Sequence, residues 1–302
     1  LTGLEKTGIL NTFAGSVRER LPELVRVQGV TPEFTDRFLD LTGQGMVPEI
    51  VVGHFNHLDP IVASDFCHSL IRLAKDQGLG ENLQGFVGTL ARSVPNGRQS
   101  RFMQEVFPHM EAHANERGVE LIPITREKDV ERYDMKLSTD EKRPLVSKLR
   151  QKGIGTMILA GGSVQPGRHP RGASGDEIFG LQEIEDMQIL ELFDSMKKYQ
   201  KPYFLPLAVN KTYRLYSSDS LLPTPEGIIS LNNVLSRVLG LFGFERVIVT
   251  VTPAMLLTSE DMAEKFGSDW RRSYAKEAID FLMTEIARIL PFNARGYYGK
   301  FI

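Results

Sequence analysis

The sequence is poor in cysteine and has no long uncharged segment. Cys67 is the single cysteine of 302 residues, which excludes an internal disulfide framework and is compatible with a reducing compartment without requiring one. No stretch of about 20 residues lacks charged side chains, so no segment is expected to span a membrane as a helix. The most apolar region, residues 228–257, is interrupted by Asn, Arg and Glu, and it suits a buried helix followed by a buried strand.

Charge of either sign is not in excess. The chain carries 36 Lys and Arg against 38 Asp and Glu, a formal net charge of -2, so no overall positive field recruits nucleic acid and we expect no nucleic-acid partner. Hydrophobic residues make up 41% and charged residues 25% of the chain, which is ordinary for a globular protein and excludes general disorder. The length allows one large α/β domain or two smaller ones.

Short apolar runs rich in β-branched residues alternate with longer segments of helical period. This pattern is typical of βα units, and it predicts an α/β fold with a central, mostly parallel β-sheet flanked by helices. Strands are expected at 49–53, 85–90, 119–124, 155–160, 203–209 and 246–251. Helices are expected at 32–41, 60–76, 98–116, 144–152, 181–200, 228–241 and 259–290, the last broken at Gly267.

The chain shows no internal repeat and no low-complexity linker. Residues 1–45 have a helical character and are expected to form a small N-terminal helical cap on the sheet. Residues 46–302 are expected to form the α/β domain that carries the site.

The most informative stretch is a buried strand that ends at Gly53 and is followed at once by polar side chains, His54, His57 and Asp59. Asp59 before Pro60 is a strong helix start, because the carboxylate accepts hydrogen bonds from free N–H groups of the first turn and proline has no N–H there to leave unpaired. His54 is therefore expected at the carboxyl end of a strand, the edge at which open α/β sheets bind ligands.

His54 and Asp59 have the His-x4-Asp spacing, and this string resembles the first motif of the glycerolipid acyltransferases, the superfamily of glycerol-phosphate and lysophosphatidate acyltransferases. Further blocks follow in the family's order. The second block is a strand ending in an arginine, the third a strand followed by a glycine-rich turn, and the fourth a strand with an internal proline. These blocks are residues 85–92 with Arg92, residues 158–163 with Gly162 and Ser163, and residues 204–209 with Pro206.

The resemblance implies transfer of a fatty acyl chain from acyl-CoA or acyl-carrier protein to a hydroxyl of glycerol 3-phosphate or a lysophospholipid. It implies that Arg92 contacts the acceptor phosphate, and that Gly162 and Ser163 belong to the acceptor site. Ala160 and Gly161 stand where the family usually has Pro and Glu. Either Asp176 or Glu177 replaces that carboxylate, or the acceptor differs, or the activity is reduced.

The chemistry of His54 can also be argued from the residue type. Transfer from a thioester to a hydroxyl requires a base near the acceptor oxygen, and imidazole with a free pKa near 6.5 is suited to this at neutral pH. A carboxylate on the far ring nitrogen, the role expected of Asp59, would fix the tautomer and stabilise the imidazolium. The acceptor hydroxyl attacks directly, so the reaction needs no serine or cysteine nucleophile, no resident cofactor and no metal.

Two alternatives remain open. In the first, His54, His57 and Asp59 are ligands of a metal-dependent hydrolase, although His-x2-His-x-Asp differs from the His-x-His-x-Asp-His spacing of the metallo-β-lactamase type. In the second, the chain is a non-catalytic lipid-binding relative. For the acyltransferase we expect a cytoplasmic or organelle-soluble location with peripheral membrane contact. The helix around residues 231–242 and the aromatic segment 292–301 are candidates for this contact, and core packing of the helix and ordinary C-terminal packing are the alternative explanations.

Overall fold

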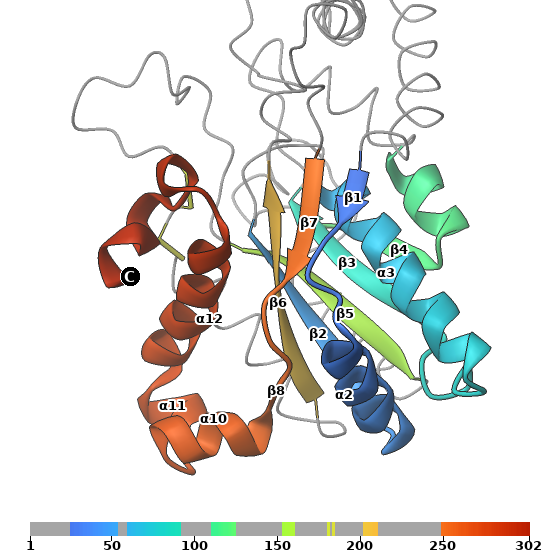
Figure 1. The fold of residues 1–302 in the computed structure, drawn as a ribbon, viewed down its shortest axis with the longest axis horizontal. Helices are drawn as coiled ribbons and strands as arrows, with labels where there is room; N and C mark the ends of the chain where they lie inside the picture. Colours follow the sequence, from blue (N-terminus) through green and yellow to red (C-terminus); the bar gives the residue numbers. More distant parts are fainter. Residues whose placement is uncertain are drawn as a thin grey trace, which may run out of the picture.

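The structure is a computed structural model, and it describes residues 25–53, 59–91, 110–124, 153–160, 180–181, 183–184, 202–210 and 249–302. Within these residues eight strands form one sheet (Figure 1). The strands are β1 (Val25–Val27), β2 (Val47–Gly53), β3 (Gly85–Ala91), β4 (Val119–Ile124), β5 (Ile154–Ala160), β6 (Pro202–Asn210), β7 (Val249–Pro253) and β8 (Leu257–Thr258).

The strand order is β1-β7-β6-β2-β5-β3-β4, with β8 paired to β6 beside β7. The five strands from β6 to β4 in this order run parallel to one another, whereas β7 and β8 run antiparallel to β6. The sheet curls into a half-barrel and is flanked by helices, which confirms the predicted α/β class with a mostly parallel sheet. All six predicted strands overlap strands of this sheet.

The described helices are α2 (Pro32–Gly43), α3 (Asp59–Asp76), α10 (Ser259–Phe266), α11 (Trp270–Ser273) and α12 (Ala275–Ile289), followed by the short 3-10 turns η1 (Phe292–Ala294) and η2 (Gly296–Phe301). α2 and α3 confirm two predicted helices. The long helix expected at 259–290 is divided into three, and Gly267 is the C-cap of α10, which confirms the predicted break at Gly267. Gly267 has a φ of 89°, a backbone conformation that favours glycine.

Other predicted helices have mixed outcomes. Residues 110–116 are helical, in agreement with the end of the helix expected at 98–116. Leu181, Glu183 and Ile184 are not helical, so the prediction of a helix beginning at 181 is wrong at its start. The predicted helices at 144–152 and 228–241 lie outside the described residues.

The N-terminal segment contributes to the sheet as well as to the helices. β1, which was not predicted, pairs in parallel with β7. α2 begins at Pro32, and the Thr31 hydroxyl accepts a hydrogen bond from the Phe34 N–H at 3.2 Å. Residues 1–24 lie outside the described residues, and the domain boundary at residue 45 stays a prediction.

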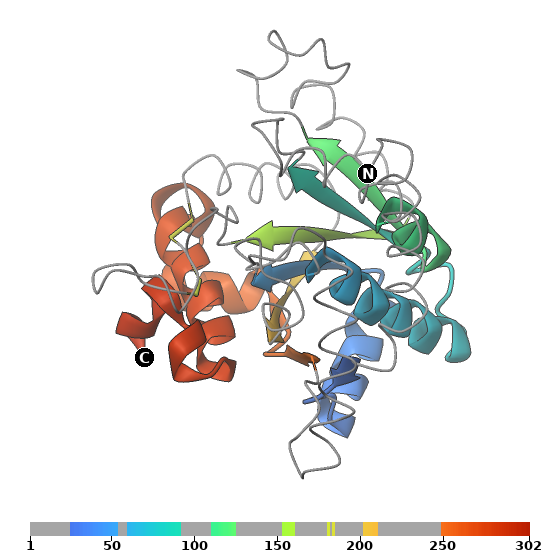
Figure 2. The same cartoon turned by 90° about the horizontal axis from the view of Figure 1, so that it is seen from above.

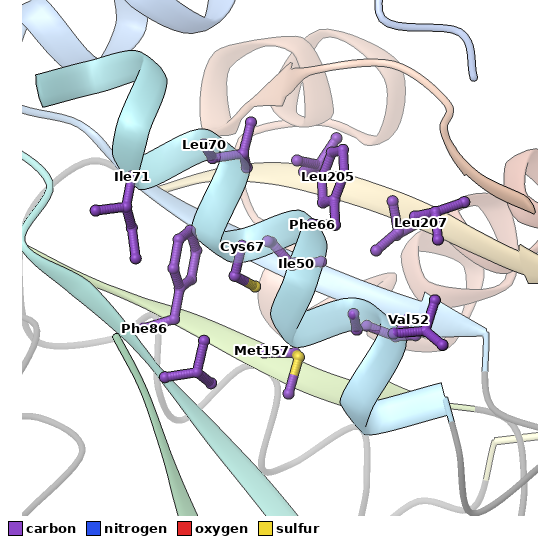
Figure 3. Close-up of a cluster of buried hydrophobic side chains, with 14 of the residues drawn as sticks. Ile50, Val52, Phe66, Cys67, Leu70, Ile71, Phe86, Met157, Leu205 and Leu207 are labelled. Carbon is purple, nitrogen blue, oxygen red and sulfur yellow. The ribbon is translucent and has the colours of Figure 1, made fainter. Parts of the chain in front are cut away.

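One hydrophobic core lies between the sheet and α3 (Figure 3). Alternate residues of β2, Ile50 and Val52, point to this face and pack with Phe66 and Leu70 of α3. Cys67 lies in the same core and is fully buried. Because successive strand residues face opposite sides, this core fixes α3 directly over the middle of the parallel strands.

A second core lies on the opposite face of the sheet, against α10, α11 and α12. Val51 of β2 and Phe204 of β6 point to this side and pack with a cluster that includes Trp270, Leu282 and Ile286. The view from above shows α2 and α3 on one side of the strands and the C-terminal helices on the other (Figure 2). Both faces of β2 and β6 are therefore buried, which explains their nearly continuous apolar sequences.

Pro206 occupies an interior position of β6, where a proline removes a ladder donor. It lies where the antiparallel partner of β6 changes, since Phe204 pairs with β8 and Leu207 pairs with β7. The Pro206 carbonyl still accepts a hydrogen bond from the Ala254 N–H at 2.9 Å. The proline of the fourth block therefore marks the gap between two partner strands.

In the described part of the chain, none of the helices has the length and the apolar character needed to cross a bilayer.

Candidate active site

The four sequence blocks occupy four neighbouring strands. In spatial order the fourth block is β6, the first is β2, the third is β5 and the second is β3, and all four run parallel. The order in space thus differs from the order along the chain. Strands of blocks separated by more than a hundred residues are brought side by side, and because the four strands are parallel their carboxyl ends share one edge of the sheet.

Three of these strands end at one level. Gly53, the last residue of β2, pairs with Ala160, the last residue of β5. β3 and β5 each continue two residues beyond their last pair, Thr89 with Ile158, and end at Ala91 and Ala160. Neighbouring strands lie about 4.8 Å apart, so the ends of β2 and β3 are roughly 10 Å apart across β5.

Asp59 is the predicted catalytic residue that the structure describes. The other predicted site residues, His54, Arg92, Gly162 and Ser163, lie outside the described residues, as do His57 and Gly161. In the sequence, however, the segments that contain these residues begin directly after the three strands that end at the same level. Position 54 follows Gly53, position 92 follows Ala91, and position 161 follows Ala160.

Asp59 is the first residue of α3, and its side chain is fully buried. The predicted helix start at Asp59 and Pro60 is therefore confirmed. The N-terminus of a helix carries a partial positive charge, which stabilises a carboxylate in its first turn. Asp59 also interacts with another group of the protein. A buried carboxylate is costly unless it is paired or hydrogen-bonded, so this position is unusual for a residue that serves only as a surface helix cap.

The end of β2 is closely packed from the α12 side. A Cβ atom on Gly53 would come within 2.9 Å of Ile286 Cγ2 and 3.1 Å of Leu181 Cδ2. Both side chains are fully buried. A larger side chain at the last position of β2 would therefore force the Ile286 or Leu181 side chain to shift, which favours glycine there.

Leu181 is held in turn by the C-terminal segment. The Tyr297 N–H donates to the Leu181 carbonyl at 2.7 Å, and the Leu181 N–H donates to the Ala294 carbonyl at 3.4 Å. Gly180 forms an isolated β-bridge with Arg295. The backbone of residues 180–181, which follows the third block in sequence, is thus hydrogen-bonded to the C-terminal segment of the chain.

Side chains add further hydrogen bonds between the two segments, and a residue of α12 adds an ion pair. The Tyr298 hydroxyl accepts a hydrogen bond from the Ile184 N–H at 3.2 Å, and the Tyr297 hydroxyl donates to Glu183 Oε1 at 2.8 Å. Lys276 of α12 lies 3.1 Å from the same carboxylate oxygen. The hydrogen bond from Tyr297 is the main cause that lowers the pKa of Glu183, with Lys276 adding to it. We call Gly180, Leu181, Glu183 and Ile184, together with residues 294–298, the C-terminal clasp. Sequence reasoning did not find it.

A polar cluster also lies on α3 beyond Asp59. His113 Nε2 lies 3.1 Å from Asp65 Oδ1, and the Arg117 guanidinium donates to the same oxygen. His68 Nδ1 lies 3.3 Å from the Arg117 carbonyl. The cluster joins α3 to the helical residues 110–116. Asp65 follows Asp59 by roughly 9 Å along the helix axis.

The described part of the chain shows neither a group of metal ligands nor a reactive thiol. There, no group of three or more His, Cys, Asp or Glu side chains is arranged to hold a metal ion. His54 and His57 lie outside that part, so the metal-dependent alternative stays a hypothesis. The Cys67 thiol is buried, and this burial raises its pKa well above the ordinary value. Cys67 therefore behaves as a small core residue.

Comparison of the chain with protein-family models and with curated protein sequences found no match.

Proposed function

We propose that this protein is an acyltransferase that transfers a fatty acyl chain from acyl-CoA or acyl-carrier protein to a hydroxyl of glycerol 3-phosphate or a lysophospholipid. The observation that carries the proposal is the placement of the four sequence blocks on four neighbouring parallel strands, β6, β2, β5 and β3. Motif residues scattered over the chain would thereby share one sheet edge, where ligands bind in open α/β folds.

The alternation of β2 supports the pairing of His54 with Asp59. Ile50 and Val52 face α3, whereas Val51 faces the α12 side, as would a side chain at Gly53. If this alternation continued for one more residue, position 54 would belong to the face that α3 covers. Asp59 begins α3 after a connection of only five residues. The imidazole and the carboxylate are therefore expected on the same face and at the same edge.

In the proposed reaction His54 is the general base. It takes the proton of the acceptor hydroxyl while the hydroxyl oxygen attacks the thioester carbonyl carbon. The new C–O bond forms, the C–S bond breaks, and the proton passes from the imidazolium to the leaving thiolate. Asp59 would hold the far ring nitrogen and stabilise the imidazolium, and such general base catalysis typically contributes about 10²–10⁴ in rate.

The neighbouring strands supply the acceptor site. Arg92 follows the end of β3, and its planar guanidinium suits a bidentate contact with a phosphate. Gly162 and Ser163 follow the end of β5, which lies between β2 and β3. Backbone N–H groups after β5, or in the first turn of α3, would stabilise the oxyanion of the tetrahedral intermediate. In this proposal the base and the phosphate contact follow the strands on either side of β5, which carries the third block.

The experiment is a thioester-release assay with long-chain acyl-CoA and acyl-carrier protein as donors. Each donor is offered with glycerol 3-phosphate, with lysophosphatidate and without an acceptor, using the wild-type chain and the His54→Ala variant. We expect acceptor-dependent release that His54→Ala reduces by about 10²–10⁴. Failure of every donor and acceptor pair would favour the non-catalytic lipid-binding alternative. A stoichiometric bound metal that is lost in His57→Ala would favour the hydrolase.

Gly161→Glu addresses the departure from the family pattern in the third block. If the missing carboxylate limits acceptor binding, Gly161→Glu lowers KM for glycerol 3-phosphate without a matching change for the acyl donor. Because acyl chains partition into membranes, we propose that the protein acts from the cytoplasm or the soluble phase of an organelle while in peripheral contact with a bilayer.

A further inference from the structure

We infer that the turn after α12 is a membrane-contacting surface that binds bilayers containing anionic lipid. We call this surface the α12 turn and define it as Arg288, Ile289, Pro291 and Phe292. The Phe292 side chain is 86% exposed, the largest value among the exposed hydrophobic residues of the described chain, and Ile289 is 36% exposed. Aromatic and aliphatic side chains that project together into water mark an interaction site more often than isolated ones do.

The α12 turn is rigidly supported. Leu290 lies between the exposed residues and is 1% exposed, and Ala294, on the far side, is fully buried. The Arg295 Nε donates to the Leu290 carbonyl at 3.0 Å, and the Ala294 N–H donates to the Pro291 carbonyl at 2.8 Å. Phe292 is therefore presented to solvent by a hydrogen-bonded turn with a buried residue on each side.

The charges within the sequence of the segment 286–302 are of one sign, and two carboxylates from outside the segment, those of Glu285 and Glu183, lie against it in space. Residues 286–302 contain Arg288, Arg295 and Lys300 and no Asp or Glu. Glu285, one turn earlier, is largely buried and lies 3.5 Å from Arg288, whose side chain remains 57% exposed. The same segment includes two further exposed hydrophobic residues, Phe301 and Ile302. The local composition is thus basic and apolar although the whole chain is slightly acidic.

The α12 turn lies near the candidate active site. Ile286 of α12 reaches the last residue of β2, Gly53, and Ile289 is the next position on the same side of the helix. The C-terminal end of α12 is therefore at the level of the carboxyl edge of the sheet, consistent with its place in Figure 1. A bilayer against the turn would lie beside the edge to which the proposed function assigns the acyl acceptor.

A membrane fits these residues better than a protein partner or a second copy of the chain. Exposed Phe and Ile next to Arg and Lys match the acyl and phosphate layers of an anionic bilayer surface. A second copy would bring the same three basic residues against themselves. The binding depends on the turn alone and not on the reaction, so it can be tested without acyl donor or acceptor.

The test is co-sedimentation of the full chain with two kinds of vesicle, phosphatidylcholine alone and equal parts of phosphatidylcholine and phosphatidylglycerol. We expect stronger binding to the anionic vesicles, weakened by salt. Phe292→Ser should weaken that binding by about tenfold, and Arg288→Gln by a smaller factor. Val30→Ser removes a hydrophobic side chain of 43% exposure in the connection before α2 and serves as the matched control.

Phe292→Trp provides a second measurement. Trp270, the single tryptophan of the chain, is 1% exposed, so a new exposed indole is readily distinguished. Its emission should shift to shorter wavelength when anionic vesicles are added. Three results would overturn the inference: no binding to either vesicle, equal binding by Phe292→Ser and wild type, or a dimer in solution that Phe292→Ser dissociates. Loss of acyltransferase activity with vesicle binding intact would contradict only the proposed function.

Discussion

Leu181 packs against Gly53, 128 positions earlier in the chain, with its Cδ2 only 3.1 Å from where a Gly53 Cβ would stand. The contact joins two parts of the candidate site. Gly53 immediately precedes His54, and Leu181 is held by the C-terminal clasp through hydrogen bonds to Ala294 and Tyr297. The position of the β2 end is therefore linked to the C-terminal segment of the chain.

Gly53→Ala is expected to destabilise the protein by about 1–3 kcal/mol, because the added methyl group overpacks against Ile286 and Leu181. Urea unfolding gives the change in free energy. Gly43→Ala is the matched control, since its Cβ would meet only Leu79 Cδ2 at an ordinary 3.9 Å. In the Ile286→Ala background the penalty of Gly53→Ala should shrink. An equal penalty in both backgrounds would show that the contact is not the cause.

Tyr297→Phe is expected to make stability less dependent on pH in the acid range. The hydrogen bond from Tyr297, followed by that from Lys276, lowers the pKa of Glu183 below its ordinary value of 4.5. A lowered carboxyl pKa contributes stability above the unfolded-state pKa, and this contribution is lost as the pH falls through the folded-state pKa.

The free energy of unfolding should therefore be smaller for Tyr297→Phe than for wild type at neutral pH, and the two values should converge as the pH falls below 4.5. Tyr274→Phe, which alters an exposed tyrosine before α12, is the control. A constant difference between Tyr297→Phe and wild type over the whole pH range would mean that the ring, and not the hydrogen bond to Glu183, is responsible.

Cys67 should not react with a thiol reagent such as dithionitrobenzoate while the protein is folded. The thiol is fully buried beneath α3, and burial raises its pKa, so very little thiolate is present at about pH 8. One thiol per chain should react after unfolding in guanidinium chloride. Rapid reaction in buffer alone would contradict the burial of Cys67. The same reaction reports global unfolding in every variant above.

Much of the fold could be predicted because the buried strands are short, mostly apolar segments that stand out in the sequence. β2 and β6 are buried on both faces and mostly apolar, with Glu49 of β2 as a buried exception, and Asp59 before Pro60 marked the start of α3 correctly. β1 and β8 were missed, since strands of three and two residues are too short to show a period. The start of the helix expected at 181 was wrong because the backbone of Gly180 and Leu181 pairs with the C-terminal segment instead.

The candidate site was predictable only in part. Local patterns located His54, Arg92 and Ser163 after strands, but they could not indicate that β5 lies between β2 and β3. Strand order depends on contacts between distant segments, and no local signal specifies those. The C-terminal clasp could not be predicted either, because it also consists of contacts between distant segments. The glycines at positions 180 and 296 are the trace that this close backbone approach leaves in the sequence. Both have positive φ, and a Cβ atom on either would meet the backbone of the opposite segment.

The most direct test of the proposed chemistry is the rate of acyl transfer by Asp59→Asn. Asparagine has nearly the same shape as aspartate but lacks the charge that would stabilise the His54 imidazolium. Asp76→Asn, at the exposed C-terminal end of the same helix, is the matched control. We predict that Asp59→Asn lowers kcat by about 10²–10⁴ with Cys67 still protected, and that Asp76→Asn leaves kcat unchanged. A folded Asp59→Asn variant with a kcat within about twofold of wild type would contradict the assignment.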